Sequence, residues 1–582
     1  MIRQQYKFPL FFLILICSHN SIAQTSNNFF INSDKLNEQV YIDCISANMS
    51  KEFAQIKDEL KKELVNRGYL NFVFNNFQID SIKEKNALNY YLDVNEGEQS
   101  YIGKINTTTN ETLDNQFFQK HFSDLEGELF FESKLNTFID ELLIKLENRG
   151  YPFAKISINS LYFDSLQNGN SVVDVYLHVE TEKERKIDNV EIIGNTKTSE
   201  KVIINAARLK KGEIYSQKRI NDIPLELNKL RFFHDVKIPK YLVDSEENGI
   251  LQITIKEKNT NSFDGIIGYV PAANSGGDGY FTGFVNISLR NLFGSGRGAS
   301  IKWEQENSLT QELELKYLEP WIFNYPLNLN VQFFQRKQDS SYVKRLFGGS
   351  LEFLATNDIS AAVIVETESI IPSLNSANLG ILNSTSLNTG IQLKIDSRDN
   401  IYSPQSGFIF TSTYKYRLRS VDENENLPSN ISNRDLEYHN YELDFGIFYS
   451  LVKDQVFAIG VHAKEVISDY YDLSDLFHLG GTNTLRGYRE RQFVGNRIIW
   501  SNLEYRFLLS NSSFLFTFFD GGYYLVNADK NNNIKRKSDF KNGYGLGISL
   551  DTALGIMKVS YAFAEGTSIS NGLIHFGLLN DF

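Results

Sequence analysis

An arginine in a glycine-rich loop and two downstream carboxylates form the most distinctive arrangement of charged residues in the sequence. The loop carries the string Gly-Gly-Thr-Asn-Thr-Leu-Arg-Gly-Tyr, which ends at Tyr488. Arg486 can donate a forked, charge-assisted hydrogen bond to a carboxylate, for which Asp520 is the best candidate and Glu504 the second. Gly487 would let the loop turn tightly, and Tyr488 would pack its tip. This chemistry is positioning rather than covalent catalysis, and spacing alone favours the alternative of a solvated Arg486.

The sequence lacks the common catalytic and ligand-binding motifs. Gly-x-Ser-x-Gly, His-Glu-x-x-His and the Walker phosphate loop do not occur. The eight histidines are scattered, and none has a second His or Cys at ligand spacing. The glycine-rich string Gly294–Gly298 is interpreted as a tight turn between two strands. We therefore expect no enzyme activity, no catalytic residue, no bound metal and no cofactor.

The composition limits the class of protein. A chain of 582 residues is too long for one compact domain, and a net charge of −12 without a basic tail argues against nucleic acid as a partner. Beyond the first 23 residues no stretch of about 18 apolar residues occurs, so no transmembrane helix is expected. Only 10 prolines in the whole chain suit many long strands, which can cross a membrane when they close into a barrel.

The first 23 residues are interpreted as a secretory signal peptide. Arg3 and Lys7 precede an apolar run that ends at Cys17 and is too short to span a bilayer. Ser21 and Ala23 are small residues at positions −3 and −1 of a cleavage site, so cleavage is predicted after Ala23. Lipid attachment at Cys17 is the alternative, but a bulky isoleucine stands directly before that cysteine. After cleavage Cys44 would be the only cysteine, so no intramolecular disulfide is expected.

The part of the chain before residue 260 contains an internal repeat. Arg67, Arg149 and Arg231 each end an amphipathic helix pattern, and both intervals are 82 residues (149 − 67 and 231 − 149). Gly68 and Gly150 stand where the end of a helix favours a left-handed residue. Two strand-like runs follow each helix. The repeated unit is predicted to be strand, helix, helix, strand, strand, although the first copy shows no clear opening strand.

The remainder of the chain is predicted to form a transmembrane antiparallel β-barrel. Strand-like segments follow one another from 262 to 582, and these 321 residues (582 − 262 + 1) would give about 20 per strand and turn in a barrel of about sixteen strands. Apolar and polar residues alternate along them. In one segment the apolar set is Leu327, Leu329, Val331 and Phe333, and the polar set is Asn328, Asn330 and Gln332. A secreted all-β protein is the alternative.

An ordered set of motifs resembles the outer-membrane protein assembly and transport superfamily, the BamA/TamA family of bacterial surface antigen type. Arg486-Gly487-Tyr488 resembles the family's Arg-Gly-Phe/Tyr loop tip. The other matching residues are Phe518, Asp520 and Gly522; Asn502, Glu504 and Arg506; Asp396 to Asn400 with Pro404 and Gly407; and Glu319-Pro320-Trp321. The repeats resemble the family's polypeptide-transport-associated (POTRA) domains. Three repeats are closer in layout to TamA than to BamA, which has five.

The resemblance implies a layout and two sites. The layout is a signal peptide over 1–23, an incompletely recognised POTRA-like domain over 24–96, POTRA domains over 97–183 and 184–259, and an outer-membrane β-barrel over 260–582. The sixth extracellular loop would fold into the lumen, which favours a paired over a solvated Arg486. A weak seam would join the first strand to the last, near Gly577 and the terminal Phe582. Gly577 would either weaken the last strand or serve barrel curvature.

The resemblance also implies a function and a location. The chain would be an outer-membrane assembly factor that helps insert or translocate client polypeptides, with its N-terminal domains in the periplasm. Its partners would be client outer-membrane or secreted polypeptides, the lipid bilayer, and a periplasmic or inner-membrane protein that contacts the POTRA domains. The alternative is a two-partner-type secretion pore for a dedicated substrate, although such pores usually carry two POTRA domains and a plug helix. A passive porin would not need the repeats.

Overall fold

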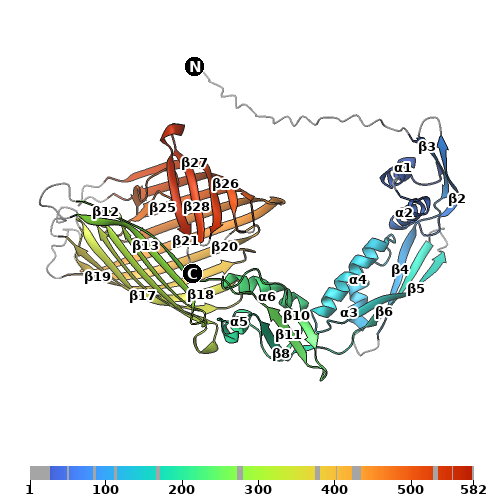
Figure 1. Ribbon diagram of the computed structural model, residues 1–582, viewed down its shortest axis with the longest axis horizontal. Helices are drawn as coiled ribbons and strands as arrows, with labels where there is room; N and C mark the ends of the chain where they lie inside the picture. The colour runs from blue at the N-terminus through green and yellow to red at the C-terminus, as the bar shows by residue number, and fades with distance from the viewer. Residues whose placement is uncertain are drawn as a thin grey trace, which may run out of the picture. The chain divides into compact units, whose positions relative to one another are not determined.

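The computed structural model describes residues 27–48, 51–82, 87–109, 115–165, 171–271, 279–373, 381–401, 403–422, 434–510, 512–528, 535–552 and 555–579. The predicted signal peptide and Phe582 lie outside these residues. The chain divides into two compact units, Met1–Arg185 with Ile214–Gln217, and Lys186–Glu213 with Lys218–Phe582 (Figure 1). None of the described helices has the length and apolar character needed to cross a membrane.

The first unit contains two α+β repeats with the same topology. Their elements are β1 (Asn28–Ser33), α1 (Glu38–Ala47), α2 (Phe53–Asn66), β2 (Val73–Ile82) and β3 (Ala87–Asn95), then β4 (Ser100–Thr109), α3 (Asn115–Phe122), α4 (Glu132–Glu147), β5 (Lys155–Ser165) and β6 (Ser171–Glu180). The sheets run β1-β3-β2 and β4-β6-β5, with the last strand central and parallel to the opening strand. The first repeat therefore has the opening strand that the sequence did not reveal.

The third repeat belongs to the second unit and has the same topology. Its elements are β7 (Lys186–Ile187), β8 (Asn189–Ile193), α5 (Glu200–Ala206), β9 (Glu213–Ile214), α6 (Gln217–Lys229), β10 (Lys240–Val243) and β11 (Gly249–Thr254). Strand β11 is central, parallel to β8 and antiparallel to β10. The sequence pattern predicts this strand over Val236–Leu242, and β10 begins four residues later, at Lys240 (240 − 236). Pro239 stands directly before it and has no N–H to give to a ladder.

Each repeat buries the helix and strand faces that its two periodicities create. In the first repeat Ile56, Leu60 and Leu64 recur every four residues on α2 and pack into one core. Strand β3 supplies every second residue to the same core, from Tyr90 through Leu92 to Val94. A stripe of the helix and one face of the sheet therefore pack together into one apolar core.

A carboxylate after the central strand fixes the turn after the opening strand in two of the repeats. Glu96 accepts hydrogen bonds from the backbone N–H groups of residues 34–36 at 3.0–3.2 Å and from Tyr41 Oη at 2.7 Å. Glu257 accepts from Thr196 Oγ1 at 2.7 Å and from the N–H groups of Lys197 and Thr198 at 3.0 and 2.7 Å. Burial by itself would raise the pKa of Glu257, but these donors outweigh it and lower the pKa to about 2.

The second unit also contains the predicted barrel, as one antiparallel sheet of sixteen strands. The strands are β12 (Ser262–Val270), β13 (Tyr280–Leu292), β14 (Arg297–Gln305), β15 (Gln311–Glu319), β16 (Leu327–Gln338), β17 (Tyr342–Leu354), β18 (Ile359–Pro372), β19 (Ser384–Asp396), β20 (Gly407–Val421), β21 (Asp435–Val452), β22 (Gln455–Ile467), β25 (Arg497–Leu508), β26 (Phe514–Val526), β27 (Lys537–Thr552), β28 (Gly555–Ala564) and β29 (Leu573–Leu579). The predicted strand number and class are confirmed. Two short 3-10 helices, Ile322–Asn324 and Ile569–Asn571, lie in turns.

The two faces of the barrel wall differ in the way a membrane barrel requires. On β18 the buried positions include Glu366 and Glu368, whereas Val363 and Val365, at the alternate positions of the same strand, are more than half exposed. Charged side chains therefore point into the lumen, and apolar side chains point outward, where lipid would cover them.

The sheet begins at β12 and ends at β29, the two strands expected to form the seam. Among the described residues no ladder joins them. Phe263 and Tyr269 on β12 and Ile574 on β29 are exposed on the outer side of this junction. Backbone groups at such an edge are available to another strand.

The third repeat contacts the turns at one end of the barrel. Arg208 Nη2 donates to the carbonyl of Leu354 at 3.0 Å, beside the β17–β18 turn. The β13–β14 turn contains Gly294 at φ +70°, where a Cβ would lie 1.8 Å from the carbonyl oxygen of Lys197. The predicted turn is present over 293–296, with Arg297 and Gly298 already in β14, and close packing on the third repeat explains Gly294.

We expect Glu257→Gln to loosen the third repeat. The substitution weakens the hydrogen bonds from the N–H groups of Lys197 and Thr198, so hydrogen exchange at these two amides should accelerate. The local stability should fall by only about 1 kcal/mol, because solvent screens the charge of this partly exposed group. The lowered pKa means that the stabilisation is complete above about pH 4.5 and is lost as the pH falls through about 2.

Hydrogen-exchange mass spectrometry of the full chain would measure this change. Glu246→Gln, at an exposed acid in the β10–β11 turn, is the matched control. Equal exchange in Glu257→Gln and the wild type would contradict the assigned role.

Candidate functional site: a loop clamped in the barrel lumen

The predicted long loop connects β22 to β25 over residues 468–496. It contains a short ribbon of β23 (Phe477–Leu479) and β24 (Phe493–Gly495). Its tip is enclosed by protein, since Leu485 is 0% exposed and Arg486 2%. The strands alternate in direction from the β17–β18 turn onward, so the loop leaves the barrel at the end opposite the third repeat. Burial of a polar tip at this position means that the loop folds back into the lumen.

Arg486 contacts both of the carboxylates proposed from the sequence. Its Nε and Nη2 donate to the two oxygens of Asp520, each at 2.7 Å, and its Nη1 donates to Glu504 Oε1 at 2.7 Å. Its backbone N–H also donates to Asp520 Oδ2 at 3.1 Å. The forked geometry is the strong, direction-specific form of a guanidinium–carboxylate pair.

The sequence around Asp520 does not show which side chains of β26 face the lumen, because aromatic residues occupy both alternating sets of positions; the contacts of Arg486 decide it. Asp520 faces the lumen together with Phe516 and Phe518, whereas Leu515 and Phe519 face outward. The guanidinium of Arg486 lies 3.7 Å from the centroid of the Phe518 ring. Inner aromatic residues therefore form a cation–π surface for the loop. Aromatic residues thus occupy both faces of β26: those on the inner face contact Arg486, and those on the outer face would meet lipid.

Neighbouring side chains complete the environment of the two carboxylates. Glu504 accepts from Lys558 Nζ at 2.9 Å and from Arg506 Nη2 at 2.8 Å. Asn502 Nδ2 donates to Asp520 Oδ1 at 2.8 Å and to the carbonyl of Thr484 at 2.9 Å. The Asn-x-Glu-x-Arg alternation on β25 thus places all three polar side chains on the lumen face.

Gly487 and Tyr488 attach the tip to the last strands. Gly487 has φ +93°, and a Cβ there would lie 2.7 Å from the backbone of Phe563 on β28. Its N–H donates to His575 Nε2 on β29 at 2.9 Å, and Tyr488 Oη donates to the carbonyl of Asn542 on β27 at 2.9 Å. The tip therefore contacts each strand from β25 to β29.

His575, Gly543 and Lys558 are residues of this site that the sequence analysis missed. His575 is one of the scattered histidines, and only its parity on the last strand could have indicated a lumen position. Gly543 begins the alternating series Gly543, Gly545 and Gly547 on β27, and a Cβ at Gly543 would lie 1.9 Å from the carbonyl oxygen of Arg486. Alternating glycines on one strand face are the signal that another backbone approaches closely.

Gly577, proposed as a seam residue, also faces the loop. A Cβ there would lie 3.2 Å from Cγ2 of Thr482. It pairs with Lys558 on β28. Space for the loop is therefore one reason for this glycine, and its role at the seam stays a prediction, as does that of Phe582.

The chemistry available at this site is holding rather than bond breaking. Arg486, Asp520 and Glu504 are mutually paired, and each oxygen of the two carboxylates accepts at least one hydrogen bond. Within the part of the chain that the structure describes, no group of three His, Cys, Asp or Glu residues could hold a metal ion. The geometry supports a fixed loop inside a barrel.

A barrel with a clamped inner loop, preceded by strand-helix-helix-strand-strand repeats, defines a POTRA-bearing membrane barrel. The model of the Omp85 superfamily domain matches residues 291–582. The model of the surface antigen variable number repeat, a POTRA domain, matches residues 185–258. The chain belongs to the Omp85 superfamily.

Individual relatives are distant. Outer membrane protein assembly factor BamA of Nitratidesulfovibrio vulgaris is 21% identical over 566 residues, 87% of this chain and 66% of that protein. BamA of Buchnera aphidicola is 22% identical over 317 residues, 53% of this chain and 49% of that protein. The chain thus spans about half to two thirds of the length of these relatives. Among solved structures, CdiB from Escherichia coli shares the fold with a TM-score of 0.51 at 11% identity, over 93% of this chain and 98% of that one.

We expect Arg486→Ala and Asp520→Ala each to destabilise the barrel by about 3–5 kcal/mol, because either change leaves a buried charge without its partner. The double variant should lose less than the sum of the two. Denaturant unfolding and the heat-dependent shift in electrophoretic mobility would measure the losses.

Arg497→Ala is the matched control. Its partner Glu465 lies with it at the exposed end of two strands, so the change should cost less than about 1 kcal/mol. Wild-type stability and wild-type electrophoretic mobility in both Arg486→Ala and Asp520→Ala would contradict the role of this ion pair in holding the loop.

Proposed function

We propose that this protein is an outer-membrane assembly factor that helps insert or translocate client polypeptides. The observation that carries the proposal is the open edge of the second repeat, at the end of its sheet. On β5 Ile158, Tyr162 and Phe163 are exposed, so both backbone groups and apolar side chains are available to an extended client segment. The relatives named as BamA assembly factors support the same function.

In this proposal the repeats and the barrel do different parts of the work. The POTRA domains, over 24–96, 97–183 and 184–259, would bind clients or partner proteins in the periplasm. The barrel, over 260–582, would sit in the outer membrane, with its β12–β29 seam and its lumen receiving the client. The driving force would be the burial of client strands as they pair, since an unpaired strand edge in lipid is costly.

The two-partner-type secretion pore is the competing function, and assembly in liposomes separates it. The purified full chain would be reconstituted, and an unfolded outer-membrane barrel would be added outside. An assembly factor should accelerate folding of that barrel into the liposome membrane over protein-free liposomes. A secretion pore should leave the folding rate unchanged and admit an extended soluble polypeptide instead, which would contradict our proposal.

We expect client contacts to concentrate on the repeat edges. A photo-crosslinking residue in place of Tyr162 on β5, or of Leu242 on β10, should capture unfolded client in intact cells, because both side chains are exposed on end strands. The same substitution at Lys211, exposed in a turn of the third repeat, is the control. Equal capture at all three positions would show that contact does not involve strand addition.

A further inference from the structure

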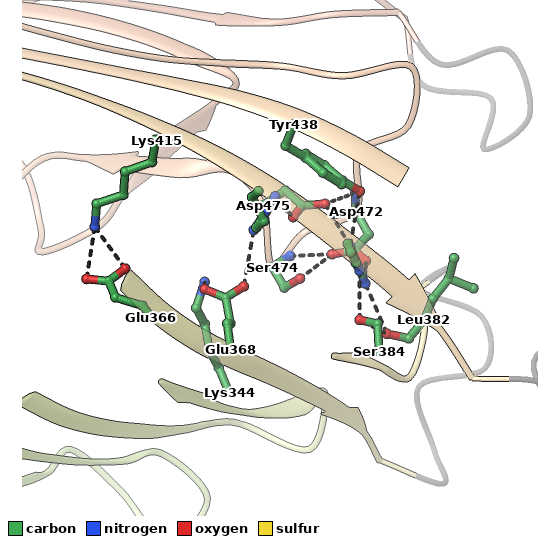
Figure 2. A network of polar contacts seen from close by, with 12 residues as sticks. Lys344, Glu366, Glu368, Leu382, Ser384, Lys415, Tyr438, Asp472, Ser474 and Asp475 are labelled. Atoms are coloured by element: carbon green, nitrogen blue, oxygen red, sulfur yellow. Dashed lines mark hydrogen bonds and ion pairs between the residues drawn. The ribbon is translucent and has the colours of Figure 1, made fainter. Parts of the chain in front are cut away.

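Two arginines on another part of the barrel wall hold a different part of the same loop. Arg417 and Arg419 alternate on β20, and both are buried. They contact a turn at Asp472–Asp475, which precedes the loop tip in the chain. Figure 2 shows the two aspartates of this turn beside Tyr438. We propose that this turn is a second anchor, which positions the loop tip by fixing the arm that leads to it.

Arg419 uses every donor that it has. Its Nε donates to Ser384 Oγ at 2.7 Å, and its Nη1 donates to Tyr438 Oη at 3.3 Å and Asp475 Oδ2 at 3.1 Å. Its Nη2 donates to the carbonyl of Leu382 at 3.0 Å and to Asp472 Oδ2 at 2.7 Å. A guanidinium has five N–H groups, so all are satisfied in one arrangement. The site is built for arginine and for a carboxylate pair.

Arg417 connects the turn to two further strands. Its Nη2 donates to Asp475 Oδ1 at 2.5 Å, and its Nη1 donates to Glu368 Oε1 on β18 at 3.1 Å. Glu368 also pairs with Lys344 on β17 at 3.0 Å. Two arginines and one lysine therefore face three carboxylates, and the buried cluster is electrically balanced.

The turn itself requires these arginines. The N–H of Asp472 donates to Asp475 Oδ2 at 3.0 Å, and the N–H of Ser474 donates to Asp472 Oδ1 at 2.8 Å. Two carboxylates are thereby held close together out of water, an arrangement that repels itself unless cations lie between them. The turn is therefore stable only when its two carboxylates contact Arg417 and Arg419, and burying it without these cations would cost free energy.

An apolar layer isolates this cluster from water. Val421, Leu436 and Val466 pack with Tyr438 and Tyr470 around the ends of the strands. The cluster therefore lies in a region of low dielectric, where unpaired charge is most costly. Detachment of the turn would leave the three cations and three carboxylates of the cluster without their partners at the same time. The anchor should therefore open as a unit.

The two anchors lie on different walls of the barrel. The Asp472–Asp475 turn pairs with the two arginines of β20, and these arginines also bond to residues of β18, β19 and β21, whereas the tip contacts β25 to β29. After the tip, Arg491 also pairs with Glu312 on β15 at 3.0 Å. The loop is thus a brace across the lumen. Its relevance to client handling rests on the proposed function, whereas the brace itself does not.

The test uses Arg419→Gln in the full-length chain. Amide exchange over 470–479 should accelerate at least about tenfold, the change produced by 1.4 kcal/mol of lost local stability. Exchange at Gly487 should accelerate too, because the tip loses its fixed arm. Arg419→Lys keeps the charge but not the five-donor geometry, so its exchange rates should lie between those of the wild type and those of Arg419→Gln.

Lys415→Met is the matched control. Lys415 lies on the same face of β20 as Arg417, two residues before it. Its Nζ is 3.0 Å from Glu366 Oε2 on β18, and this pair is separate from the Asp472–Asp475 turn (Figure 2). Exchange in the loop should stay at the wild-type rate. Acceleration equal to that of Arg419→Gln would overturn the proposal.

A second variant separates anchoring from general packing. Asp475→Asn added to Arg419→Gln removes one of the unbalanced carboxylates, so the double variant should exchange more slowly than Arg419→Gln alone. A purely structural contact would give losses that add. Unchanged exchange in Arg419→Gln, or acceleration confined to 470–479, would overturn the brace whatever the liposome assay gives. A loosened loop with normal client assembly would support the brace and count against the proposed function.

Discussion

The lumen of this barrel is organised by the cost of enclosing charge. A guanidinium removed from water without a partner loses several kcal/mol, so each enclosed arginine dictates where carboxylates must stand. Arg486 fixes the inward facing of β25 and β26, and Arg419 fixes the arm of the loop against β19 to β21. The path of the loop follows from these two demands. Apolar residues are then free to occupy the outer face.

The same constraint explains which neighbours are small. The loop backbone approaches the wall so closely at Gly487 and Gly543 that a methyl group would collide with carbonyl oxygens. Polar pairing draws the segment inward, and glycine permits the approach. Charge and size therefore act together at the tip, and neither alone would specify where it lies.

Sequence patterns predicted the barrel and the repeats because their signals are local, whereas the paired Arg486 was favoured only by the family resemblance of the motif set. Strand alternation and helix spacing extend over a few residues, and the motifs of β25 and β26 are short. The facing of Asp520 was ambiguous because hydropathy does not distinguish an aromatic residue that meets lipid from one that meets an arginine. The partners of Arg417 and Arg419 in the loop lie 53 to 58 positions away, and no short pattern connects them. Strand β1 was missed because Phe29 to Ile31 form a run without alternation.

The hydrogen bond from Gly487 to His575 has a consequence for the terminal strand. On the same face of β29 the positions two residues away are Leu573 and Gly577, and neither side chain can accept a hydrogen bond. A slip of β29 by one pleat in either direction would thus break the bond and leave the amide unmatched. The loop tip therefore bonds to β29 in one register only, and a misaligned final strand would lose this contact from inside the lumen.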